Sequence, residues 1–133
     1  MKWQQKDYDY IPGTYVFDGK RAHPSYALNK LLFSFNEDVN RKAFDADPAS
    51  YCDKFGVTGE YKDVVVNQDF LQMLRLGANI YLMAKMAIPR GVSVQDAGAA
   101  FQAITTKEFQ QNLLDKGLDL EEKLAQRGDY WNG

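Results

Sequence analysis

Residues 26–35 read YALNKLLFSF, and this stretch decides the fold class. Its apolar side chains Leu28, Leu31, Leu32 and Phe35 recur at spacings of three and four residues. Such spacings draw one apolar stripe along a helix, because an α-helix turns once every 3.6 residues. The stretch therefore predicts an amphipathic helix.

Helix-capping residues divide the sequence that follows. Asn36 offers an N-cap side chain to a second helix, and the pair Asp47-Pro48 repeats the signal more strongly. Aspartate accepts hydrogen bonds from the free amides of a first turn, and proline at the first helical position lacks only an N–H that has no partner there. A third helix is therefore predicted from Pro48 to Phe55, ending at Gly56.

The same signals predict short helices along the rest of the chain. The spacing of Thr105 and Glu108 is that of a capping box, Gly77 is expected to end a helix in a left-handed conformation, and residues 89–91 (PRG) are the clearest break. The valine run 64–66 would suit a strand equally, but its context favours a helix. These later helices are expected over residues 60–67, 70–76, 78–87, 94–103, 106–116 and 120–126.

The sum of these signals is an all-α protein, predicted as a single compact domain over residues 1–133 with about seven to nine short helices. Residues 1–25 are expected to form an irregular N-terminal arm, residues 26–117 the helical core, and residues 118–133 a short helix and a tail. Neither an internal repeat nor a low-complexity linker divides the chain.

The counts of histidine and cysteine exclude most metal chemistry in this chain. Among 133 residues there is one histidine, His23, and one cysteine, Cys52. Neither a common His/Cys zinc site nor an iron site with two histidines and a carboxylate can be assembled from them. The lone thiol also fits a reducing compartment, so we expect a cytoplasmic protein that binds no metal of its own.

The charge pattern gives no sign of nucleic acid or membrane as a partner. Sixteen basic and 18 acidic residues leave a net charge of −2, which attracts neither polyphosphate nor an anionic lipid surface. Residues 1–6 (MKWQQK) lack the apolar segment of a signal peptide.

No side chain is indicated as a catalytic group. His23 is expected to be a surface or hydrogen-bonded residue and Cys52 a small, half-buried apolar residue. Asp45 and Asp47 are close enough in sequence to pair, but helix capping explains Asp47. Eight tyrosines, eight phenylalanines and two tryptophans supply aromatic surface for packing, either on the chain's own core or on another chain. The residues alone therefore indicate a helical interaction module.

Four blocks of sequence make a more specific comparison possible. They are Ile11–Thr14 (IPGT) followed by Val16-Phe17, then Tyr26–Lys30 (YALNK), then Asn40–Phe44 (NRKAF) with Tyr51 beyond it, and Gly77–Lys85 (GANIYLMAK). In this order, and from about residue 11 to residue 117, the chain resembles the small (alpha) subunit of protocatechuate 4,5-dioxygenase.

This resemblance implies a two-chain extradiol, aromatic-ring-opening dioxygenase. In that family a large (beta) subunit supplies two histidines and a glutamate to Fe(II), and the small helical subunit covers the mouth of the active site. The reaction opens a carboxylated catechol, such as protocatechuate or gallate, beside its two hydroxyls and inserts both atoms of O2. The present chain is then expected to be the non-catalytic small subunit, with the iron in its partner, and to act as an enzyme only within the complex.

The resemblance also implies candidate site residues. Val94 and Gln95 lie in a stretch similar to a Ser-Phe-Gln stretch of the family, and they are expected to line the substrate pocket of the complex. Asn79, Tyr81 and Phe101 are expected at the interface with the large subunit. Val94 stands where well-known members have an aromatic side chain, which predicts a roomier or differently shaped pocket.

Simpler readings stay open beside these. Asn79 would also serve as a helix cap and Tyr81 as a core aromatic residue. Ser25 and Ala78 stand where the family usually has glycine, and both are tolerable if Gly77 supplies the left-handed turn. A free-standing helical adaptor of the same fold, which binds another protein or a peptide, is the alternative function.

Overall fold

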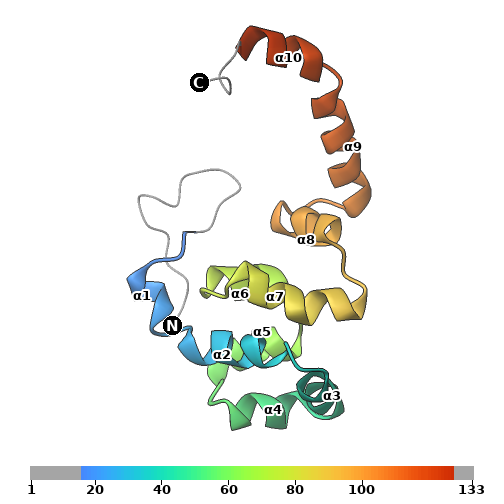
Figure 1. The fold of residues 1–133 in the computed structure, drawn as a ribbon. Coiled ribbons are helices and arrows are strands. Elements are labelled where there is room, and N and C mark those ends of the chain that lie inside the picture. The colour runs from blue at the N-terminus through green and yellow to red at the C-terminus, as the bar shows by residue number, and fades with distance from the viewer. Residues whose placement is uncertain (1–15, 128–133) are drawn as a thin grey trace.

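The computed structural model describes residues 16–127, and this part of the chain is helical throughout, with short connections (Figure 1). The elements, in chain order, are α1 (Gly19–Ala22), α2 (Tyr26–Ser34), α3 (Asp38–Ala46), α4 (Pro48–Lys54), α5 (Gly59–Val66), α6 (Phe70–Arg75), α7 (Ile80–Ala87), the 3-10 helix η2 (Ile88–Arg90), α8 (Val94–Phe101), α9 (Thr106–Gly117) and α10 (Leu120–Arg127). Residues 16–127 contain no β-strand, so the predicted all-α fold class is confirmed.

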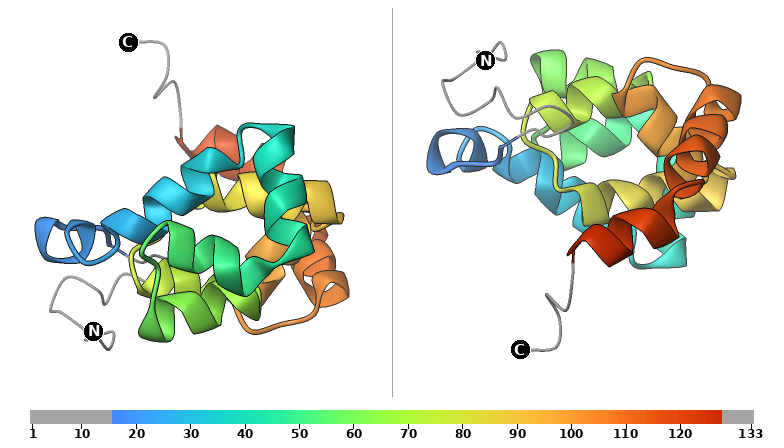
Figure 2. Two further views of the ribbon diagram at one scale, coloured as in Figure 1. Left: turned by 90° about the horizontal axis from the view of Figure 1, so that it is seen from below. Right: turned by 90° about the horizontal axis from the view of Figure 1, so that it is seen from above.

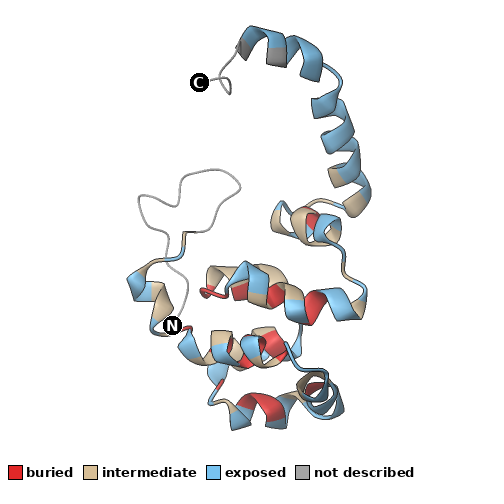
Figure 3. Cartoon of the chain, in the orientation of Figure 1, coloured by how far each residue is buried: buried red, intermediate tan, exposed pale blue. Residues whose placement is uncertain are grey.

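The apolar stripe of α2 lies in the centre of the core, as its spacing predicts. Leu28, Leu31, Leu32 and Phe35 are each at most 1% exposed, and α2 packs along α7. Full burial of a side chain of this size contributes about 1.5–3 kcal/mol. Figure 3 shows the buried residues on α2, α3, α4, α6 and α7, and α5 adds Val65 to the same cluster.

Three aromatic rings join α2 to α3 and α4. Phe35 meets Phe44 edge to face with ring centroids 5.1 Å apart, and Tyr51 lies 5.9 Å from Phe35 and 5.8 Å from Phe44. Rings at these separations attract one another beyond the area that they bury. Phe44 is the last residue of the block Asn40–Phe44, and the sequence comparison named Tyr51 together with that block. The two rings therefore meet in the core.

Most helix starts lie where the capping residues place them. The N-caps whose side chains accept a first-turn amide are Asp18, Asp47, Asp69, Asn79, Ser93 and Thr105. Asn36 is an exception, because its amide donates to the Phe33 carbonyl in the turn that ends α2, and Glu37 is the N-cap of α3. The valine run 64–66 is helical, as expected, in α5.

Two further details differ from the sequence prediction. Helix α1 lies inside residues 1–25, which were expected to be irregular, and it raises the number of α-helices in residues 16–127 to ten. It is four residues long and has no apolar stripe, so it gives no periodic signal; Asp18 starts it by accepting from the Arg21 amide at 2.9 Å. The first 15 residues of the expected arm, and residues 128–133 of the tail, lie outside the described part.

The last three helices leave the core in sequence. Helix α8 lies over α6 and α7, α9 follows it, and α10 lies beyond α9 (Figures 1 and 2). Helix α9 has no buried residue, in contrast to α8, where Ala99 is buried. None of the helices in residues 16–127 combines the length and the apolar character that crossing a membrane requires.

Candidate functional site

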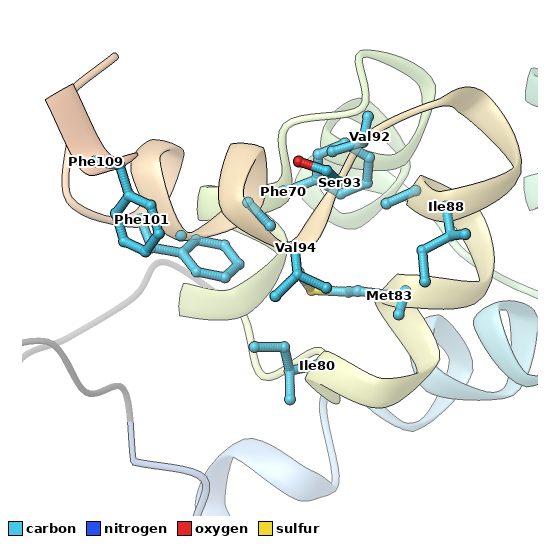
Figure 4. A pocket seen from close by; sticks show the side chains of 13 residues that line it. Phe70, Ile80, Met83, Ile88, Val92, Ser93, Val94, Phe101 and Phe109 are labelled. Carbon is cyan, nitrogen blue, oxygen red and sulfur yellow. The ribbon is translucent and has the colours of Figure 1, made fainter. Parts of the chain in front are cut away.

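An apolar groove lies between α7 and α8, with a volume of about 250 Å³. Phe101 and Phe109 lie at one end of it and Ile88 at the other, and Ile80, Met83 and Val94 line it between them (Figure 4). Of the 13 residues that line it, only Ser93 has a polar side chain. The groove therefore presents a hydrocarbon surface with no charged group.

The break after α7 forms one side of this groove. Pro89 lies in the 3-10 helix η2, and Gly91 follows in a left-handed conformation with φ 79°. Glycine adopts this conformation without the steric penalty that a Cβ atom brings. The chain thus reverses within a few residues and brings Val92 and Val94 opposite α7.

Helices α8 and α9 are held together at the other end of the groove. A Cβ atom at Gly98 would lie 2.7 Å from the Cζ atom of Phe109, so only glycine lets this ring pack so close to α8. Thr106 donates a side-chain hydrogen bond of 2.7 Å to Asp96, whose second oxygen accepts from the Ser93 amide at 2.8 Å. These hydrogen bonds lower the pKa of Asp96 below its usual range, and the bond from Thr106 has the largest effect.

The predicted pocket residues separate in the structure. Val94 lies at the rim of the groove and is 79% exposed. Gln95 does not line the groove, and its side-chain oxygen accepts a hydrogen bond of 2.7 Å from Gln110 on α9. Phe101, expected at the interface, lines the groove and packs partly against the core.

The two simpler readings at α7 have opposite outcomes. Asn79 is the helix cap, since its side-chain oxygen accepts from the amides of Tyr81 at 2.9 Å and Leu82 at 3.3 Å. Tyr81 is not a core aromatic residue, because it is 80% exposed. Helix α7 instead buries Met83 and Met86, which lie one turn apart on its other side. A role for either residue at a subunit interface stays a prediction.

Asn29, which the sequence did not single out as a site residue, holds the start of α7 on α2. Asn29 donates to the Gly77 carbonyl at 2.9 Å and accepts from the Asn79 amide at 2.7 Å. Gly77 has φ 98°, the left-handed turn that was expected of it, and a Cβ atom there would lie 2.9 Å from the Oγ atom of Ser25. The blocks Tyr26–Lys30 and Gly77–Lys85, which the sequence comparison named separately, therefore lie in contact.

The groups considered for chemistry have ordinary structural roles. His23 is exposed, as expected, whereas Cys52 is fully buried rather than half-buried, and burial raises the pKa of its thiol. Asp45 forms an ion pair with Arg90, and Asp47 caps α4. Within residues 16–127, no three His, Cys, Asp or Glu side chains lie close enough together to bind a metal ion.

Comparison with known proteins identifies the family of this chain. Residues 28–114 match the family described as aromatic-ring-opening dioxygenase LigAB, LigA subunit. The chain is also 26% identical over 109 residues to a gallate dioxygenase of Pseudomonas putida; the match covers 82% of this chain and 32% of that protein. The chain thus spans about a third of the length of this relative. The family match covers the core, the Asn29–Asn79 contact and the groove, and the chain belongs to the LigA-subunit family of aromatic-ring-opening dioxygenases.

Proposed function

We propose that this chain is the non-catalytic small subunit of an extradiol dioxygenase, and that it caps the Fe(II) site of a large subunit which cleaves a carboxylated catechol with O2. Protocatechuate and gallate are the first substrates to test. The observation that carries the proposal is the apolar groove of α7 and α8, with Val94 exposed at its rim. The proposed complex is cytoplasmic, in keeping with the lone thiol of the chain.

The composition of the groove supports a covering role. An apolar wall over an active site excludes water, which strengthens electrostatic interactions inside the site and protects reactive intermediates. The groove offers no charge to a carboxylate, and the hydroxyl of Ser93 already donates to Asp96 at 2.7 Å. Burying an anion without a partner is costly, so the substrate carboxylate is assigned to a cation of the large subunit.

The iron is assigned to the large subunit because the present chain has too few residues that could bind it. One histidine in 133 residues is too few for a site with two histidines and a carboxylate. His23 is exposed, and its neighbours in the sequence, Ala22 and Pro24, have no side chain that binds a metal. Bound in the partner, Fe(II) supplies the activation of O2 and of the catechol. The present chain supplies shape and exclusion of water.

Exposed apolar side chains beside the groove are the proposed contact with the large subunit. Ile80 is 49% exposed, Tyr81 80% and Ile88 58%, all within α7 and η2. Asn79 contributes by fixing the first turn that carries Tyr81, and Phe101 by closing the groove behind the rim. Aromatic residues such as Tyr81 are enriched at protein interfaces.

Co-expression with a large dioxygenase subunit tests the proposal. The expected result is a stable complex that contains iron and consumes O2 with protocatechuate or gallate. Tyr81→Asp should abolish co-purification because it places a charge in the apolar contact, without changing the helical circular dichroism of the free chain.

Val39→Asp on α3 is the matched control. Val39 is 70% exposed, so this variant makes the same kind of change on a different element and should leave the complex intact. A chain that stays monomeric beside every large subunit tried, or a complex that consumes no O2 with any catechol acid, would contradict the proposal. The first of these results would favour the adaptor function.

A further inference from the structure

Arg90 joins the break after α7 to a different part of the core. Its guanidinium group donates to the Met86 carbonyl at 2.8 Å and forms an ion pair with Asp45 on α3. The same group lies over the ring of Phe44, with the Cζ atom 5.2 Å from the ring centroid. Only 18% of the Arg90 side chain is exposed, whereas the side chain of Asp45 is 61% exposed, so the guanidinium group is largely covered while the carboxylate stays open to water.

The segment that Arg90 holds is the one that forms the rim of the groove. Directly after it, the Gly91 amide donates to the Ile88 carbonyl at 2.9 Å and the Val92 amide donates to the Ala87 carbonyl at 3.2 Å. Val94 follows two residues later at the rim. The segment that carries Val92 and Val94 is therefore tied to α7 by the Val92 amide and to α3 by Arg90.

We propose that Arg90 is a positioning residue for this site: through Asp45, Phe44 and the Met86 carbonyl it fixes the place of Val92 and Val94 at the rim of the groove. The consequence for catalysis rests on the proposed function, since it requires the rim to form part of a substrate pocket. The positioning itself is a property of the free chain and is tested there.

The chemistry of these three contacts requires arginine. A guanidinium group is planar and presents several N–H donors in a fixed fork, so it bonds to a carbonyl and a carboxylate at once while its face lies on a ring. A lysine ammonium group at the same place is a point charge and makes fewer of these contacts together.

Hydrogen exchange of the free chain is the first test. Arg90→Ala should raise the exchange rates of the Gly91 and Val92 amides about tenfold, because hydrogen bonds to a charged group are lost beside them. The amide of Val57, which donates to the Cys52 carbonyl in the core, should be unchanged once exchange by global unfolding is subtracted. Arg90→Lys should give an intermediate rate, and Asp45→Asn a smaller rise because two of the three contacts remain.

Lys85→Ala is the matched control, since it removes an exposed positive charge from the neighbouring turn of α7. Faster exchange confined to Gly91 and Val92 in the Arg90 and Asp45 variants supports the proposal. Exchange at these two amides no faster than in Lys85→Ala overturns it, as does a rise of equal size at Val57. If Arg90→Ala does not fold, Arg90→Lys and Asp45→Asn decide in the same way.

The complex supplies the second test. With a large subunit bound, Arg90→Lys should change the ratio of kcat/KM for protocatechuate to that for gallate severalfold, while the amount of complex recovered stays the same. An unchanged ratio in a variant that shows the faster local exchange overturns the catalytic consequence. If the unmodified chain forms no active complex, the proposed function fails, and the hydrogen exchange still decides the positioning role.

Discussion

The side-chain oxygen of Asn29 accepts a hydrogen bond of 2.7 Å from the backbone amide of Asn79, which lies 50 residues later in the sequence. The side-chain nitrogen of Asn29 donates to the Gly77 carbonyl. Asn79 in turn caps α7, so one residue of α2 fixes the turn and, through it, the first turn of the helix that carries Ile80 and Tyr81. A contact between α2 and the turn before α7 thus determines where the exposed residues of the proposed interface lie.

Replacing Asn29 by alanine should destabilise the chain by about 2 kcal/mol, because the Gly77 carbonyl and the Asn79 amide both lose their partner. The measurement is the free energy of unfolding from urea denaturation followed by circular dichroism. Asn112→Ala, an exposed change on α9, should alter this free energy by less than about 0.5 kcal/mol. Equal effects of the two variants would show that the Asn29 bonds contribute nothing net.

Gly77→Ala should cost about 2–3 kcal/mol, since it adds a Cβ atom at φ 98° and places it 2.9 Å from the Ser25 hydroxyl oxygen. Gly59→Ala is the control for the backbone cost alone. Gly59 has φ 58° and open space around the Cβ position, so about 1 kcal/mol is expected there. Ser25→Gly also removes the hydrogen bond from Ser25 to the Arg21 carbonyl, so the double variant is compared with Ser25→Gly alone. Gly77→Ala should cost less in that background, and an equal cost would mean that the contact with Ser25 contributes nothing to the loss.

The helices and their caps could be predicted from the sequence because their signals are local. The stripe in residues 26–35 belongs to a single helix, and the Asp47-Pro48 pair and the Thr105 cap each act within one turn. Helix α1 escaped prediction because it is too short for periodicity to show. The alternative reading of Tyr81 as a core aromatic residue was wrong because α7 has apolar residues on both of its sides, and packing alone decides which side is buried.

The groove could not be predicted from the sequence, although two of the residues that line it, Val94 and Phe101, were named as a candidate pocket residue and a candidate interface residue. Its lining comes from α6, α7, α8 and α9, so it depends on how separate helices pack. Phe70 and Phe109 look like ordinary core positions in the sequence. The small residue Gly98, which admits the Phe109 ring, gives no signal without its partner. Resemblance to a family indicated the region, but the arrangement needed the structure.

Acid should destabilise the junction of α8 and α9 through Asp96. The hydrogen bonds from Thr106 and Ser93 lower the pKa of this carboxyl in the folded chain, so its contribution is complete above its ordinary pKa and is lost as pH falls through the lowered value. Asp96→Asn should lower the urea midpoint at pH 6 and reduce the change in midpoint between pH 6 and pH 3. Asp63→Asn, an exposed change on α5, should leave the difference near that of the unmodified chain.

The Asp96→Asn variant should keep part of the acid sensitivity of the unmodified chain. Asp47 and Glu108 are also hydrogen-bonded at helix starts, by Ser50 and Thr105, and their pKa values are lowered in the same direction. An identical pH dependence in Asp96→Asn and the unmodified chain would contradict the role assigned to the Asp96 bonds.

Val94→Phe should change which catechol acid the complex prefers while leaving the stability of the free chain within about 0.5 kcal/mol, because the side chain is 79% exposed before assembly. A larger ring at the rim reduces the space that the groove leaves above the substrate, and changes of this size in an apolar pocket alter discrimination by about tenfold. The measurement is kcat/KM for O2 uptake with protocatechuate, gallate and a methylated gallate. Val39→Phe adds the same ring at an exposed valine of α3 and should leave all three values unchanged. If Val94→Phe also leaves them unchanged in an intact complex, Val94 does not face the substrate.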